Sequence, residues 1–313
     1  MTSTPAQRTR LLVTGGTGLL GVNWAAALRG DCDVWLGTHR RQLRLRGVQS
    51  VALPLDSAPA LARVLDELRP GIVVHAAGLS NVDDCERSPA EAKRINADLA
   101  AAVATAAAER GLKLVHISTD HLFAGDRPLR GEADAPAPVN AYARSKLEGE
   151  RLVAERCPQA LIVRTNFFGW GHALRKSISD WVLEGLRGGR KLRMFSDVHF
   201  TPILATRLAR TVHALLAAGA SGIVNVCGDE RVSKHEFALR LAAAFGLPAA
   251  GIEESRDAAA GLAAPRPADL SLSNARARGI LGGPLGGLDE FFTELRGQEA
   301  GGLRDELQRA VSE

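Results

Sequence analysis

A glycine-rich segment near the start of the chain constrains the fold more than any other feature. The apolar, β-branched run "RLLVTGG" (10–16) has the character of a strand, and "GLLGVNWAAALRG" (18–30) has that of a helix. At their junction, Gly15, Gly18 and Gly21 follow one another at three-residue intervals. Glycine tolerates the sharp turn that such a junction needs, and this junction is the usual first unit of a doubly wound α/β sheet.

The alternation of strand and helix continues through the first half of the chain. Short runs rich in valine, isoleucine and leucine predict strands at 32–38, 48–56, 71–78, 113–119 and 160–166. Longer amphipathic or alanine-rich stretches predict helices at 58–68, 88–111 and 140–156. The helix at 88–111 is expected to be capped by Ser88, with Pro89 at its first position. This alternation predicts the α/β class, with a Rossmann-type doubly wound parallel sheet.

The composition and charge argue against several kinds of partner: nucleic acid, a metal ion and a membrane. The 313 residues carry a formal net charge of +4, and no long basic run alternates with aromatic residues, so nucleic acid is not an expected partner. Four widely spaced cysteines predict neither a disulfide framework nor a zinc site, and we expect no bound metal. No secretory signal precedes the first strand and no apolar run is long enough to span a membrane, which predicts a cytoplasmic protein.

The glycine string also indicates a ligand. It reads as G-x-x-G-x-x-G from Gly15 and as G-x-G-x-x-G from Gly16, and both spacings occur in dinucleotide-binding turns. In either case, main-chain N–H groups approach a pyrophosphate at the positive end of the following helix. We therefore expect a dinucleotide-binding domain over 1–168, to which 200–228 returns. Residues 169–313 are expected to form mainly a smaller C-terminal substrate-binding lobe, with predicted helices at 177–189 and 233–246.

The segment "STDH" (118–121) contains the residue types of a hydrolase charge relay. Successive strand side chains point to opposite faces, so Asp120 and His121 are not expected to reach one hydroxyl. A different chemistry follows from "YARSK", in which Tyr142 and Lys146 share one face at the start of a helix. A phenol has a pKa of about 10, and we expect the Lys146 ammonium to bring the pKa of Tyr142 closer to neutral pH.

These segments together resemble the extended short-chain dehydrogenases/reductases, and among them most closely the dTDP-4-dehydrorhamnose reductases. The resemblance covers almost the whole chain and rests on "GGTGLLG" (15–21), "HAAG…NVDDCERSP…RINA" (75–97), "STDHLFAG" (118–125), "YARSK" (142–146), "RTNFFG" (164–169) and "RPADLSL" (266–272). It implies NADPH-dependent reduction of the 4-keto group of a nucleotide-activated deoxysugar. A nucleotide-sugar substrate is part of that implication, and a homodimer is compatible with it.

The resemblance also assigns roles to residues. Thr119 is expected to hydrogen-bond the substrate carbonyl, Tyr142 to give it a proton, and Lys146 to hold the nicotinamide ribose as well. Asn96 falls where the superfamily often uses an asparagine to hold a backbone carbonyl and a relay water, with a plain surface asparagine as the alternative. The expected cofactor contacts are Gly15, Thr17, Gly18, Leu19, Leu20, Gly21, Arg40, Arg41, Asp56, Ala76, Ala77, Gly78, Tyr142 and Lys146.

The choice between NADPH and NADH depends on the end of the second strand. In NAD-selective folds an acidic residue there binds the ribose 2′-hydroxyl. This chain has "GTHRRQ" at that point, so Arg40 and Arg41 replace the carboxylate, and Asp33 lies at the other end of the strand. A guanidinium can bind a 2′-phosphate through two charge-assisted hydrogen bonds. The sequence therefore predicts NADPH, with a solvated basic helix start as the alternative interpretation of these arginines.

Several positions depart from the reductase pattern and keep other functions open. His121 stands where those reductases usually carry Tyr, and Ala143 replaces a Gly, which leaves the sugar open. The nearby pair Arg175 and Lys176 could meet a nucleotide diphosphate or belong to a solvated loop. One alternative is an epimerase or dehydratase of the same superfamily, although dehydratases usually carry Asp-Glu after the Thr. Another is a binding protein such as the regulatory subunit of methionine adenosyltransferase, which has the same fold.

Overall fold

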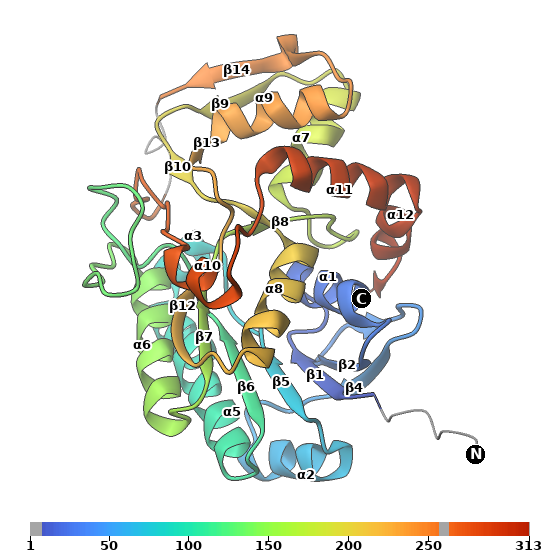
Figure 1. Ribbon diagram of the computed structural model, residues 1–313, viewed down its shortest axis with the longest axis vertical. Helices are drawn as coiled ribbons and strands as arrows, with labels where there is room; N and C mark the ends of the chain where they lie inside the picture. The colour runs from blue at the N-terminus through green and yellow to red at the C-terminus, as the bar shows by residue number, and fades with distance from the viewer. Residues whose placement is uncertain (1–7, 257–262, 313) are drawn as a thin grey trace.

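A seven-stranded parallel sheet forms the centre of the molecule (Figure 1). The computed structural model describes residues 8–256 and 263–312; the segment 1–7, part of the region searched for a secretory signal, lies outside them. The strands follow the order β12-β7-β6-β5-β1-β2-β4, and all their pairings are parallel. Their bounds are β1 Arg10–Thr14, β2 Asp33–Thr38, β4 Gln49–Ala52, β5 Ile72–His75, β6 Lys113–Ile117, β7 Leu161–Arg164 and β12 Gly222–Asn225.

Helices cover both faces of this sheet. One face packs against α1 (Leu19–Leu28) and α8 (Ala205–Ala217), which lie against each other and share one apolar core. The other face packs against α2 (Ala58–Leu68), α5 (Leu99–Ala108) and α6 (Ala141–Arg156), which enclose a second core. The predicted fold class, a Rossmann-type doubly wound α/β sheet, is confirmed.

The helix expected over 88–111 is wrong as a single α-helix. It is divided into α4 (Pro89–Lys93), a π-helical turn (Arg94–Asp98) and α5, and the Ser88 side chain makes no capping hydrogen bond. A short helix, α3 (Val82–Arg87), precedes it. Close packing accompanies the turn: a Cβ on Gly149 of α6 would lie 2.3 Å from the carbonyl oxygen of Asn96. Single π-helical turns inside α-helices are frequent at functional sites, and this one carries Asn96.

A small lobe lies above the carboxyl ends of the sheet in Figure 1. It consists of α7 (Ile178–Arg187), the parallel pair β9 (Leu192–Phe195) and β14 (Ile252–Ser255), the antiparallel pair β10 (His199–Phe200) and β13 (Val232–Ser233), α9 (Lys234–Ala244), the 3₁₀ turn Ala249–Gly251, and α11 (Leu288–Ala300). Edge-to-face aromatic contacts join it to the strand pair β8 (Phe167–Phe168) and β11 (Ile203–Leu204), because Phe168 packs against Phe237, Phe291 and Phe292.

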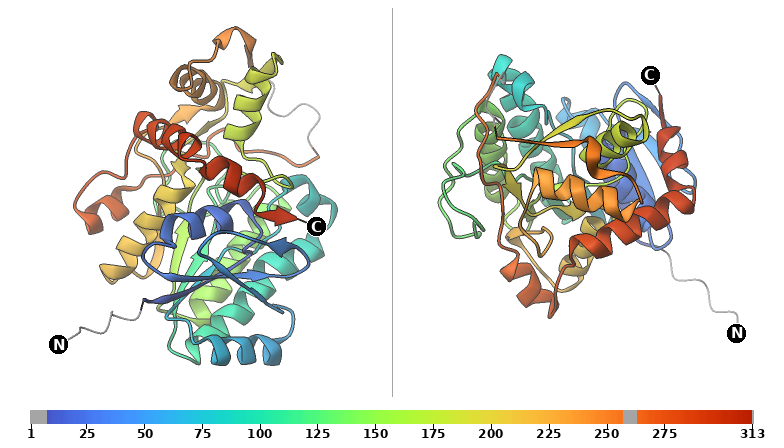
Figure 2. Two further views of the ribbon diagram at one scale, coloured as in Figure 1. Left: turned by 90° about the vertical axis from the view of Figure 1, so that its right-hand side faces the viewer. Right: turned by 90° about the horizontal axis from the view of Figure 1, so that it is seen from above.

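The second half of the chain returns to the N-terminal domain twice. After α8, β12 pairs with β7 at the edge of the sheet, and α10 (Ala275–Leu281) lies beside it. At the C-terminal end, α12 (Leu303–Gln308) leads to β15 (Val311–Ser312), which pairs with β3 (Gln42–Leu43); Figure 2 shows this end beside the N-terminal elements. Sequence analysis did not anticipate this last return. The division of the chain at about residue 168 stays a prediction.

Candidate active site

A cleft of about 530 Å³ opens where the carboxyl ends of the strands meet the small lobe. Most of the residues expected to bind a cofactor line it: Gly15, Thr17, Gly18, Leu19, Leu20, Gly21, Arg41, Ala76, Ala77, Gly78, Tyr142 and Lys146. Three expected site residues, Arg40, Asp56 and Thr119, do not line the cleft. The chain thus brings the glycine loop, the end of β5 and the Tyr–Lys helix to one place.

The glycine loop is held against the end of β5 through backbone contacts. Gly15 has a φ of +66°, and a Cβ there would lie 2.8 Å from the Cα of Ala77. The Thr14 hydroxyl accepts a hydrogen bond from the Ala77 N–H at 3.2 Å. The helix α1 that follows starts at Gly18 without a side-chain cap, so its first N–H groups face the cleft with the positive end of the helix dipole. This arrangement fits the pyrophosphate of a dinucleotide.

The two arginines beyond β2 lie in different places. Arg41 lines the cleft, whereas Arg40 is exposed outside it. Asp33 lies at the opposite end of β2, where its carboxylate pairs with the Arg10 guanidinium at 3.1 Å. Asp56 is exposed in the turn before α2. Of the two arginines considered for the 2′-phosphate, Arg41 is therefore the one placed at the cleft.

Tyr142 and Lys146 lie in the first turns of α6, on the face that looks toward the ends of β5 and β6. The Asn140 side chain caps this helix by accepting a hydrogen bond from the Ala143 N–H at 2.8 Å. The Lys146 ammonium donates to the Ile117 carbonyl at 2.7 Å, at the end of β6. Burial lowers the pKa of Lys146 to about 8, and the Glu150 carboxylate opposes that fall.

The expected lowering of the Tyr142 pKa is wrong for this structure. Burial raises the pKa of the phenol above its ordinary value, and the Asp120 carboxylate adds to the rise. The groups that oppose it most are Thr119, through a side-chain hydrogen bond, and the Arg175 guanidinium, rather than Lys146. A raised pKa keeps the phenol protonated at neutral pH, which is the form that a proton donor needs.

Thr119 lies immediately behind the cleft lining and is held by its neighbours. Its hydroxyl donates to Asp120 Oδ1 at 3.1 Å and accepts from the His121 N–H at 3.2 Å. Asp120 is 2% exposed, and its Oδ2 accepts from the Asn166 amide at 2.5 Å. The His121 ring packs edge-on against Tyr142, with centroids 5.5 Å apart, and its Nε2 is 4.0 Å from Asp120 Oδ1. Asp120 therefore orients the Thr119 hydroxyl instead of forming a hydrolase relay.

Asn96 is not a surface residue. It is 1% exposed in the π-helical turn, where its Oδ1 accepts from the Leu79 N–H at 2.8 Å. Its Nδ2 donates to the Leu79 carbonyl at 3.0 Å and to Ser145 Oγ at 2.9 Å. Asn96 also lines the cleft, so it fixes the loop after β5 relative to the helix that carries Tyr142 and Lys146.

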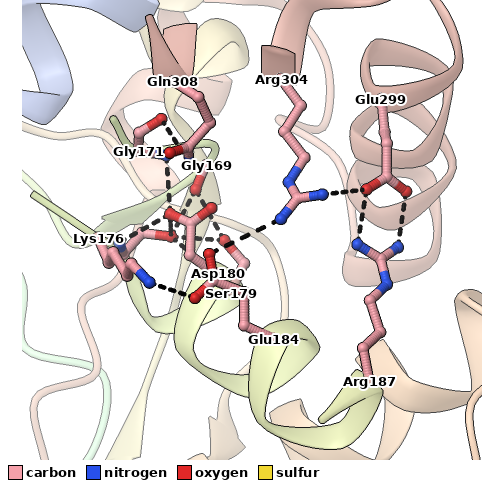
Figure 3. A network of polar contacts seen from close by, with 11 residues as sticks. Gly169, Gly171, Lys176, Ser179, Asp180, Glu184, Arg187, Glu299, Arg304 and Gln308 are labelled. Carbon is pink, nitrogen blue, oxygen red and sulfur yellow. Dashed lines mark hydrogen bonds and ion pairs between the residues drawn. The ribbon is translucent and has the colours of Figure 1, made fainter. Parts of the chain in front are cut away.

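The loop between β8 and α7 brings two cationic side chains to the cleft. Sequence analysis left the role of both open. Arg175 and Lys176 line the cleft, and Arg175 donates to Ser80 Oγ at 2.5 Å. Asp180 anchors this loop by accepting from the N–H groups of Gly171 at 2.7 Å and Ser177 at 2.9 Å. The polar contacts in Figure 3 continue to the C-terminal helices through three links: Lys176 to Glu184, Glu184 to Arg304, and Gln308 to Gly171.

Asn166 and Lys234 line the cleft as well, and sequence analysis missed both. Asn166 follows β7 directly, so the rule that polar residues after parallel strands gather at one edge could have identified it. Lys234 stands alone at the start of a small-lobe helix, with no recognisable motif around it. Within residues 8–256 and 263–312, no cluster of His, Cys, Asp and Glu side chains could hold a metal ion. No helix in these ranges has the length and apolarity needed to cross a membrane.

Comparison with known proteins is consistent with this geometry. The family described as RmlD substrate binding domain matches residues 9–291. The chain is 31% identical to the probable low-salt glycan biosynthesis reductase Agl14 of Haloferax volcanii, over 86% of this chain and 91% of that protein. It is also 31% identical to methionine adenosyltransferase 2 subunit beta of Danio rerio, over 85% of this chain and 83% of that protein. The crystal structure of dTDP-4-dehydrorhamnose reductase from Bacillus anthracis in complex with NADP superposes with a TM-score of 0.82 at 25% identity, covering 93% of this chain and 100% of that one. The chain therefore belongs to the RmlD substrate binding domain family, as its resemblance to the dTDP-4-dehydrorhamnose reductases indicated.

Proposed function

We propose that the protein is an NADPH-dependent reductase acting on the 4-keto group of a nucleotide-activated deoxysugar. One observation carries the proposal: Tyr142, with a protonated phenol, lies in the same cleft as Lys146 and a glycine loop shaped for a dinucleotide. Bound NADPH would supply the hydride. The sheet domain would hold that cofactor and the small lobe the sugar nucleotide, and a homodimer stays a prediction.

The residues of the chain divide the remaining work. The Thr119 hydroxyl, which donates to Asp120 in this structure, would turn on substrate binding to donate its proton to the substrate carbonyl and polarise it. The Tyr142 phenol would give a proton to the developing alkoxide. The Lys146 ammonium, with a pKa of about 8, remains mostly charged at neutral pH and would stabilise the phenolate left behind. Its hydrogen bond to the Ile117 carbonyl holds the ammonium at the end of β6.

The choice of NADPH rests on Arg41. Its guanidinium lines the cleft beside the glycine loop, where a 2′-phosphate would lie, and no carboxylate occupies the end of β2 in its place. Arg40 is directed elsewhere, so the preference would depend mainly on one arginine. The reductase from Bacillus anthracis, which was crystallised with NADP, supports the same cofactor.

A second candidate function is a binding partner without turnover. The 31% identity to methionine adenosyltransferase 2 subunit beta over 85% of this chain favours it. The presence of Thr119, Tyr142 and Lys146 around one cleft favours catalysis instead. An epimerase or dehydratase remains the third possibility, and His121 in place of a glutamate argues against the dehydratase.

One assay separates these functions. Purified protein is mixed with NADPH and a panel of nucleotide-linked 4-keto-6-deoxyhexoses, and the loss of nicotinamide absorbance is followed. The reductase should consume NADPH with at least one member and form a 4-hydroxy product. Tight NADPH binding without turnover across the whole panel would favour the binding protein, and isomerised or dehydrated sugar without net NADPH consumption would favour the third possibility.

A further inference from the structure

Among the helices and strands of the small lobe that follow residue 178, Lys234 alone lines the cleft. It is the first residue of α9, and its main-chain N–H donates to the Val198 carbonyl at 3.0 Å. The strand pair β10–β13 fixes this start, since Phe200 faces Val232 in its register. The backbone of Lys234 is therefore held in place by the strand pair, and its side chain lines the same cleft as Tyr142.

The ammonium of Lys234 is in an unusual environment. It lies over the face of Phe200, 3.2 Å from the ring centroid, which is a cation–π contact. Burial lowers the pKa of this ammonium to about 8, and the Asp120 carboxylate opposes the fall. Among the described residues, no hydrogen bond or salt bridge engages it within the usual distances. Lys234 is partly exposed where it lines the cleft, so its unpaired ammonium is accessible to a ligand oxygen.

The neighbours of Lys234 locate that ligand oxygen. Its charge acts on Asp120 and on the His121 imidazole, the two residues that follow Thr119. Asp120 in turn accepts the hydrogen bond from the Thr119 hydroxyl. Lys234 enters the cleft from the small lobe, whereas the glycine loop belongs to the sheet domain, so its partner is expected on the sugar substrate rather than on the cofactor.

We propose that Lys234 is a specificity-determining residue that donates a hydrogen bond to the sugar hydroxyl on the carbon next to the reacting ketone. The proposal rests on the function proposed above, because it presumes a 4-keto sugar in the cleft. For such a sugar the relevant group is the 3-hydroxyl, since the carbon on the other side carries the methyl group. A hydrogen bond from a charged donor contributes about tenfold or more in affinity.

The test compares two substrates, a nucleotide-linked 4-keto-6-deoxyhexose and its 3-deoxy analogue. The wild-type protein should show a kcat/KM about tenfold or more higher for the hydroxylated sugar. Lys234→Met, which keeps the length and the packing on Phe200, should lose most of that preference through a higher KM, with the 3-deoxy sugar changed less than about twofold. Lys234→Arg should retain part of the preference. The matched control is Lys191→Met. Lys191 is an exposed lysine just before β9 that pairs with Glu253, and this variant should behave like the wild type.

The outcomes separate this inference from the proposed function. Absence of NADPH consumption by the wild type with every 4-keto sugar would overturn the proposed function itself. A wild type that turns over both sugars with equal kcat/KM would overturn only the assignment of Lys234, even if Lys234→Met failed to fold. Equal losses of Lys234→Met on both sugars would also contradict it, because they would indicate a structural role. Binding of NADPH by Lys234→Met, measured by fluorescence, should match the wild type.

Discussion

The two halves of the cleft are built in different ways. The half beside β1 and β5 consists mainly of backbone and small residues, namely the glycine loop and Ala76 to Gly78, with Arg41 as its charged group. The half beneath the small lobe consists of buried or partly buried polar side chains, including Tyr142, Lys146 and Lys234. The first binds through main-chain N–H groups and the helix dipole, and the second through individual side chains.

This difference has a consequence for substitution. A site made of backbone depends on the path of the chain, so single side-chain changes around it should alter binding little unless they fall on the loop glycines, where a Cβ would clash. A site made of side chains in a low-dielectric environment depends on each group, because removing one leaves its buried partner unsatisfied. Single substitutions should therefore separate cofactor binding from turnover.

The largest effect is expected from the substrate half. Tyr142→Phe removes the proton donor but keeps the ring that packs against His121, and it should lower kcat by about a hundredfold or more. The affinity for NADPH should stay within about twofold, because the glycine loop is untouched. Steady-state kinetics and a fluorescence titration measure the two quantities. Near-normal turnover would remove Tyr142 from the mechanism, and a parallel loss of NADPH binding would contradict the separation of the two halves.

A smaller effect is expected from the single charged group of the cofactor half. Arg41→Ala should raise the KM for NADPH about tenfold or more and leave that for NADH largely unchanged, because only NADPH carries the 2′-phosphate. Arg40→Ala is the matched control, since Arg40 is exposed outside the cleft, and it should change either KM less than about threefold. Equal effects of the two substitutions would mean that both arginines reach the phosphate, and a wild type that prefers NADH would exclude the proposed role.

The two halves also differ in how far the sequence predicts them. The glycine loop, the end of β5 and the Tyr–Lys helix are contiguous segments with fixed spacing, so their place at one edge of a parallel sheet follows from strand–helix alternation alone. Asn166 and Lys234 come from separate segments, and only the packing of the small lobe brings Lys234 over the cleft. Sequence spacing contains no information about that packing.

The errors have physical causes of the same kind. The π-helical turn at Arg94–Asp98 packs closely against Gly149, a tertiary contact that the alanine-rich pattern of 88–111 does not reveal. The Tyr142 pKa was expected to fall because the neighbouring lysine was considered without burial, and in the structure burial dominates. Arg40 and Arg41 are both exposed and only Arg41 lines the cleft, a difference set by the loop between β2 and β3 that two adjacent arginines do not specify; a cofactor contact of Arg40 stays a prediction.

A last prediction concerns stability rather than turnover, and it comes from the sheet beneath both halves. His75 and His116 are adjacent partners on β5 and β6, with stacked rings 5.5 Å apart, and they are 1% and 0% exposed. Burial lowers the pKa of both imidazoles, that of His75 to about 3, and the Lys146 charge lowers them further. The unfolded chain therefore binds protons near pH 6.5 that the folded chain does not, so the free energy of unfolding should fall as the pH drops from about 6.5 toward 3, with a slope approaching 1.4 kcal/mol per pH unit for each histidine.

Both ring nitrogens of His116 lack a hydrogen-bond partner among the described residues, so His116→Leu should be tolerated above pH 7. Urea denaturation at pH 8, 6 and 5 measures how much of the free energy of unfolding is lost on acidification. In His116→Leu the part of that loss that comes from the two histidines should be about halved, and kcat at pH 8 should stay within about threefold of the wild type. An unchanged slope between pH 6 and 5 would show that His116 is not kept neutral by the fold.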